Sequence, residues 1–177
     1  MTRAFLGLDQ SLSNTGWAVA QISGDAVCIE AYGTLRTKST SELYARLGAI
    51  KAFTKSLIDS YQPEMVFTER VFINPAINTS CINLIRVETV LHQLLVELGF
   101  PYIVMPSIAR QSDSWRYPFA LSSEKKDSAN LFGKKLPALT EHSADAVGIV
   151  LGGLLQHDYI SLEAALNFEL GPSLKAS

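Results

Sequence analysis

The sequence predicts one α/β domain built around a mixed β-sheet. Two observations indicate this class. Three strand-like runs, at 3–9, 16–22 and 27–33, follow one another through short polar turns and form an antiparallel meander. Two later apolar runs, at 64–69 and 101–105, each follow a helical segment, as strands of parallel type do. A chain of 177 residues is long enough for one such domain with a real core.

The first helix is expected over 41–60, because apolar residues recur there at helical spacing. These residues are Leu43, Leu47, Ile50, Phe53 and Leu57. Ser39 or Thr40 could cap this helix, and the acidic Glu42 favours its first turn. The sequence therefore predicts an N-terminus capped by one of these two hydroxyls.

A longer helix is expected over 79–98, since Gly99 supplies a termination signal and apolar residues cover a wide face. Shorter helical pieces follow at 107–112, 122–133 and 142–155, separated by prolines. We expect one domain over 1–158 and a C-terminal tail over 159–177, in which 162–168 could form a short helix.

The composition favours a soluble globular protein, with 47% hydrophobic and 18% charged residues. No apolar run reaches the length of about 18 residues that a membrane helix needs, so no membrane partner is expected. Charges within the first nine residues argue against a signal peptide. Cys28 and Cys81 lie in apolar runs, so we expect two buried, reduced thiols. A cytoplasmic location follows from these expectations.

Charge is distributed unevenly along the chain. The net charge of −2 argues mildly against a nucleic-acid-binding protein. Basic residues nevertheless outnumber acidic ones over 34–60 and 110–135. Such basic faces beside an acidic pocket suit a phosphate backbone and its metals, although ordinary solvated surface is an equal alternative. Arg70, Arg110, Arg116 and Lys126 are the candidate DNA-binding cations.

Four potential metal ligands end or begin separate elements. Asp9 ends the first strand, and Glu69 ends the strand after the first helix. If these strands are parallel neighbours, both carboxylates emerge at the edge where α/β sheets bind ligands. His142 and Asp145 are three residues apart, so a helix places them on one face. The first turn of that helix could then present both beside Asp9.

Carboxylate oxygens suit Mg²⁺ or Mn²⁺, and one imidazole shifts the preference toward Mn²⁺. Two such ions about 4 Å apart can activate water and stabilise a leaving oxygen in phosphodiester hydrolysis. Each residue also has a simpler explanation. Asp9 could start a turn, Glu69 could pair with Arg70, His142 could simply begin a helix, and Asp145 could bond to a neighbouring backbone or lysine.

Three segments that carry these residues resemble RuvC Holliday junction resolvases, namely 6–19, 68–72 and 142–149. The resemblance covers roughly 3–155, with the same order and similar spacing. It implies an RNase H-like fold, a five-stranded mixed sheet flanked by helices. It also implies a metal-dependent endonuclease that resolves four-way DNA junctions by paired symmetric nicks, with two Mg²⁺ or Mn²⁺ ions per active site.

The resemblance assigns a role to each candidate ligand. Asp9 resembles the metal-bridging aspartate, Glu69 the glutamate that ends the fourth strand, and Asp145 the last aspartate. His142 occupies a position held by aspartate in some members and by histidine in others. These four are the predicted catalytic and metal-binding residues.

The resemblance also suggests two contacts with DNA. Phe72 resembles an aromatic that touches bases near the crossover, with a core position as the alternative. Lys125 resembles a basic residue near the scissile phosphate, with plain helix surface as the alternative. The chain departs from the family at Gln10, where Pro-Gly usually follows the aspartate, and at Ser114, where a lysine is expected. Arg116 is a candidate substitute for that lysine.

Resolvases of this family work as homodimers, and helix 79–98 could supply the symmetric surface. A helix wholly buried inside the domain is the alternative. The departures and the low net charge favour a bacteriophage member over a bacterial one.

Three other functions stay open. One is an acetate and sugar kinase-like or Hsp70-like ATPase, although such enzymes need two domains of this kind. Another is an RNase H-like nuclease acting on RNA–DNA hybrids, flaps or other branched DNA. The third is a non-catalytic module that binds junctions.

Overall fold

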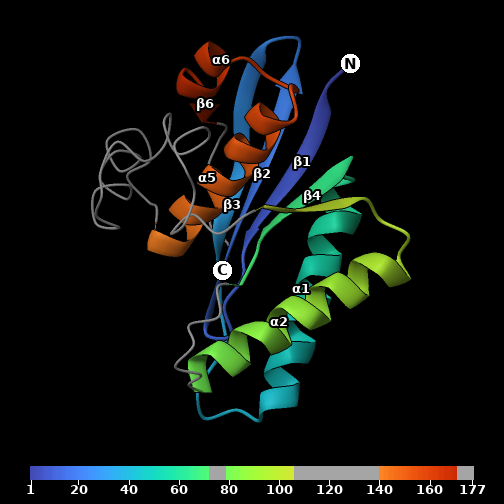
Figure 1. Cartoon of the computed structure of the whole chain (residues 1–177), viewed down its shortest axis with the longest axis vertical. Coiled ribbons are helices and arrows are strands. Elements are labelled where there is room, and N and C mark those ends of the chain that lie inside the picture. The colour runs from blue at the N-terminus through green and yellow to red at the C-terminus, as the bar shows by residue number, and fades with distance from the viewer. Residues whose placement is uncertain (72–78, 106–139, 171–177) are drawn as a thin grey trace.

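A single mixed sheet of six strands, in the order β5-β4-β1-β2-β3-β6, organises the domain (Figure 1). The computed structural model describes residues 1–71, 79–105 and 140–170. The strands are β1 Arg3–Asp9, β2 Asn14–Ser23, β3 Ala26–Arg36, β4 Met65–Glu69, β5 Tyr102–Met105 and β6 Glu169–Leu170. β1, β2 and β3 form the antiparallel meander, while β4 and β5 run parallel to β1. The five predicted strands are therefore present.

The sixth strand was not predicted. β6 is only two residues long and joins the free edge of β3, where Cys28 pairs with Glu169 and Ile29 with Leu170. The short helix expected in the tail is α6 Leu162–Leu166. Ala164 and Ala165 of α6 belong to the same buried cluster as the sheet.

Helices cover both faces of the sheet. α1 Leu43–Tyr61 and α2 Thr79–Glu97 lie on one face, and α5 Glu141–Gln156 lies on the other with α6 (Figure 1). The strand alternation explains the two cores, because successive side chains point to opposite faces. Leu6 and Leu8 pack toward α1 and α2, whereas Phe5 packs toward α5.

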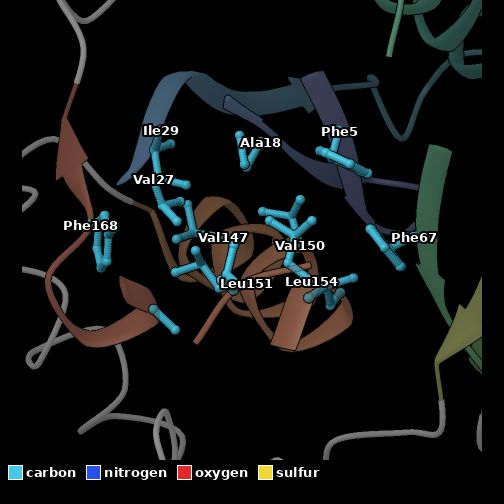
Figure 2. Close-up of a cluster of buried hydrophobic side chains, with 14 of the residues drawn as sticks. Phe5, Ala18, Val27, Ile29, Phe67, Val147, Val150, Leu151, Leu154 and Phe168 are labelled. Carbon is cyan, nitrogen blue, oxygen red and sulfur yellow. The ribbon is translucent and has the colours of Figure 1, made fainter. Parts of the chain in front are cut away.

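α5 lies directly on the sheet. Its side chains Val150 and Leu154 point toward Phe5 and Phe67, and Val147 lies beside Val27 (Figure 2). The close approach needs a glycine in the sheet, since a Cβ on Gly7 would lie 2.5 Å from the carbonyl oxygen of Ala146. α5 therefore packs closely against β1 at Gly7.

The predicted capping of the first helix is wrong. α1 begins at Leu43, and Glu42 is its N-cap residue without a capping hydrogen bond from its side chain. The N–H of Ser41 donates to the carbonyl of Lys38, so residues 38–41 form a turn. Ser39 and Thr40 lie within that turn and are too far from the helix to cap it.

The prediction for Cys28 is also wrong in part. Cys81 is buried, but Cys28 is only partly buried. Cys28 points to the sheet face opposite Val27 and Ile29, which fill the core beneath α5 and α6. In the described ranges, no helix has the length and apolar character that crossing a bilayer requires. The helical pieces expected at 107–112 and 122–133 lie outside the described residues.

Candidate active site at the carboxyl ends of β1 and β4

Asp9 and Glu69 come to the same edge of the sheet because β1 and β4 are parallel neighbours. Their register pairs Leu8 with Thr68, so Asp9 and Glu69 are the next residues of the two strands. Phe67 packs in the core toward α5, and Glu69 follows it by two residues. By the same alternation Asp9 follows Gly7, so both carboxylates belong to the face that α5 covers.

The first turn of α5 reaches Asp9. The imidazole Nδ1 of His142 lies 2.8 Å from the Oδ2 oxygen of Asp9. An ionised carboxylate only accepts hydrogen bonds, so the Nδ1–H of His142 donates to it. The side chains of His142 and Asp9 are 32% and 15% exposed, respectively. Solvent therefore reaches this pair from one side.

Gly16 makes this approach possible. It pairs with Asp9 across β1 and β2. A Cβ at this position would lie 1.9 Å from the backbone oxygen of His142 and 3.2 Å from the Cβ of Asp9. Only a hydrogen atom fits between the sheet and the start of α5, so the sequence must have glycine here if His142 is to touch Asp9.

Hydroxyl groups hold the N-terminus of α5 in place. Thr140 is the N-cap residue and forms a capping box with Ser143, so each side chain bonds to the backbone of the other residue. The Thr140 hydroxyl also lies 2.5 Å from the hydroxyl of Thr34 in β3. The helix start is thus tied to the third strand of the sheet.

Sequence reasoning did not select Gly16, Thr34, Thr140 or Ser143. A Thr-x-x-Ser pattern before an apolar run was a visible, although weak, sign of the cap. The contact between Thr34 and Thr140 has no sequence signal, because it joins residues 106 positions apart.

Only some of the four expected ligands are arranged as a divalent cation needs. Asp9 and His142 offer an oxygen and a nitrogen donor at one place, and Glu69 ends the adjacent strand. Asp145 is partly buried near the start of α5. Among residues 1–71, 79–105 and 140–170, no three His, Cys, Asp or Glu side chains lie close enough to hold a metal together. A divalent ion at this edge would be held through Asp9 and His142, which are in contact.

The predicted DNA contacts fall mostly outside the described residues. The residues outside are Phe72, Arg110, Arg116, Lys125 and Lys126. Arg70 is described and exposed, and its backbone N–H donates to the carbonyl of Met105 at 2.7 Å.

The fold and this edge define an α/β domain of the RNase H-like class, in which acidic residues from neighbouring strands meet beside a covering helix. A model of the family described as crossover junction endodeoxyribonuclease RuvC matches residues 5–100, more than half of the chain. The chain belongs to the RuvC family.

Individual relatives agree with this assignment. The crossover junction endodeoxyribonuclease RuvC of Orientia tsutsugamushi (strain Ikeda) is 40% identical over 75 residues, which are 42% of this chain and 47% of that protein. The protein of the same name from Rickettsia prowazekii is 35% identical over 69 residues, which are 39% of this chain and 44% of that protein. The chain spans about half the length of the curated relatives it matches.

Solved structures support the fold over a longer stretch. Thermus thermophilus RuvC in complex with a Holliday junction substrate has a TM-score of 0.71 at 17% identity, covering 89% of this chain and 96% of that one. The yeast mitochondrial Holliday junction resolvase has a TM-score of 0.63 at 15% identity, covering 92% and 81%. These likenesses extend the fold assignment beyond the family match.

Proposed function

We propose that this chain is a metal-dependent endonuclease that resolves four-way DNA junctions by paired symmetric nicks, acting in DNA recombination and repair. The observation that carries the proposal is the contact between Asp9 and His142 at the carboxyl edge of the sheet, in a chain of the RuvC family. The relatives that match are named crossover junction endodeoxyribonucleases, and one solved neighbour is in complex with a Holliday junction substrate.

In this proposal Asp9, Glu69, His142 and Asp145 would hold two divalent ions, Mg²⁺ or Mn²⁺. When bound, such ions neutralise charge on the phosphate and lower the pKa of a coordinated water. The protein positions the donors. His142 orients the carboxylate of Asp9 through its Nδ1–H, and Gly16 lets the start of α5 come close enough to do so.

Basic groups near the same edge would meet the phosphate backbone. Arg36 pairs with Asn14 at the end of β3, and both Arg36 and Lys38 are exposed. Arg46 donates from Nη2 to the hydroxyl of Ser13 at 2.9 Å, in the connection that follows Asp9. These cations support a polyanionic substrate at this edge.

The remaining DNA contacts are proposed from the family resemblance. Lys125 would lie near the scissile phosphate and Phe72 near the bases at the crossover. Further phosphate contacts would come from Arg70, Arg110, Arg116 and Lys126.

Two nicks in strands of like polarity need two active sites, so we propose a homodimer. The exposed apolar side chains of α2 support a homodimer. Its inner face is buried through residues such as Val87 and Leu91, yet Ile82 and Val96 are 40% and 66% exposed. A helix buried on all sides would not present these apolar side chains to solvent.

The deciding experiment offers labelled four-way, three-way, flap and linear DNA to the protein in Mg²⁺ and in Mn²⁺. We expect preferential cutting of the four-way junction at symmetric positions. The variant Asp9→Asn should bind the junction without cutting it, and normal cutting by this variant would contradict the mechanism.

The same assay separates the alternatives. Tight junction binding without cutting by the unaltered protein would indicate a non-catalytic module. Preferential cutting of an RNA–DNA hybrid would indicate an RNase H-like nuclease, and ATP turnover would indicate a kinase-like ATPase.

A further inference from the structure

The segment that carries Glu69 is held by side chains from outside its own strand. We call residues 68–71 the β4 exit. The Thr68 hydroxyl lies 3.2 Å from Nε2 of His92 on α2. The backbone N–H of Val71 donates to Oε1 of Glu88, one turn earlier on α2, at a longer 3.4 Å. α2 therefore contacts the residue before Glu69 and the second residue after it.

His92 is itself fixed against the sheet. Its ring stacks on Tyr102 of β5, with centroids 5.0 Å apart and planes 26° apart. Burial lowers the pKa of His92, so the ring is neutral at pH 7 and can either donate to Thr68 or accept from it. Thr68 is fully buried, so water cannot replace His92 as its partner.

Two further hydrogen bonds hold the backbone of the β4 exit. The Gln10 amide donates from Nε2 to the carbonyl of Glu69, and Gln10 is only 5% exposed. The N–H of Arg70 donates to Met105 in β5. Because Thr68 points toward α2, the next side chain, Glu69, points to the opposite face, where Asp9 lies. The backbone of the β4 exit thus fixes the Cα of Glu69 and the face of the sheet from which its side chain extends.

We propose that Thr68 and His92, assisted by Glu88, are positioning residues that set the Glu69 carboxylate for metal binding. This inference rests on the proposed function, because it takes Glu69 as a metal ligand. None of the three residues touches the substrate. Each acts on the reaction through the backbone of the β4 exit.

The test uses a matched pair of Thr→Val substitutions, which keep the side-chain shape and remove only the hydroxyl. Thr68→Val breaks the contact with His92. Thr54→Val is the control, because Thr54 is also buried, on α1 on the same side of the sheet, and its hydroxyl has no hydrogen-bond partner in the described part of the chain. Mn²⁺ affinity is measured by titration calorimetry without DNA, and folding is checked by circular dichroism.

We expect Thr68→Val to weaken Mn²⁺ binding by about tenfold, the lower end of the loss that follows when the support behind a metal ligand is removed. Thr54→Val should bind Mn²⁺ as the unaltered protein does. Equal Mn²⁺ affinity in the two variants would overturn the positioning role. An unaltered protein that binds no Mn²⁺ would instead overturn the proposed metal site, and the inference with it.

A second pair keeps the test decisive if Thr68→Val does not fold. Glu88→Ala removes the acceptor of the Val71 N–H, whereas Glu88→Gln retains an oxygen that can accept it. We expect faster amide hydrogen exchange at Val71 and weaker Mn²⁺ binding in Glu88→Ala, with both restored in Glu88→Gln. Unchanged exchange and affinity in Glu88→Ala would remove Glu88 from the proposal.

Discussion

The imidazole of His142 lies 2.8 Å from the carboxylate of Asp9, although 133 residues separate them along the chain. This contact joins the end of the first strand to the start of the last long helix. The contact depends on Gly16 beneath α5 and on the cap that Thr140 provides, so substitutions at each of these residues test it.

The first prediction concerns the metal preference of the site. His142→Ala should lower the rate of junction cutting by roughly 100-fold, since it removes a proposed ligand and the partner of Asp9. His142→Asp should retain cutting and raise the rate in Mg²⁺ relative to Mn²⁺, because an all-oxygen set suits Mg²⁺ better. Initial rates in each metal give the measurement.

The control for these variants is His157→Ala, because His157 is exposed at the other end of α5. It should cut at the normal rate with the normal metal preference. Normal cutting by His142→Ala would exclude His142 from the site.

The second prediction concerns the close approach at Gly16. Gly16→Ala should destabilise the protein by about 1–3 kcal/mol, because its methyl group collides with the backbone of His142. The collision moves the start of α5 away from Asp9, so cutting should also be lost. Urea denaturation and the cleavage assay measure the two effects.

Gly48 provides the comparison for this substitution. It lies in the middle of α1, and a Cβ there would meet nothing within 4 Å. Gly48→Ala should therefore stabilise the protein by about 1 kcal/mol and leave cutting unchanged. Equal stabilities for the two alanine variants would refute the steric argument.

The third prediction concerns the cap of α5. Thr140→Ala removes the acceptor for the Ser143 N–H and the contact with Thr34, and should cost about 1 kcal/mol of unfolding free energy. Because the loosened turn carries His142, the cutting rate should fall as well. Ser161→Ala, which removes the cap of α6, should reduce stability without slowing the reaction. A rate unaffected by Thr140→Ala would show that the cap does not position His142.

The fourth prediction concerns pH. Burial holds the pKa of His92 below its ordinary value of 6.5, so the folded state binds fewer protons than the unfolded state just below that pH. The stability contributed by neutral His92 is therefore present above pH 6.5 and is lost as the pH falls through the lowered pKa of the folded state. His92→Gln should flatten this part of the stability profile, which urea denaturation at a series of pH values records. An identical slope in both proteins would contradict the desolvation of His92.

Local patterns predicted much of this protein, because they depend on neighbours a few residues apart. Alternation placed Asp9 and Glu69 at strand ends, and helical spacing put His142 at the start of an apolar helix. The two-residue β6 was missed, since a strand so short has no periodicity to detect. The first helix was given the wrong cap because a turn at 38–41 precedes it.

The sequence by itself determined the order of β1 to β5 and of α1, α2, α5 and α6, since period and polarity are properties of the local chain. Only the tertiary structure decided that β4 lies beside β1, that α5 rests on Gly16, and that His92 meets Thr68. The physical reason is that strand register and close backbone approach bring together groups that are remote in sequence, and no local pattern encodes which remote groups will meet.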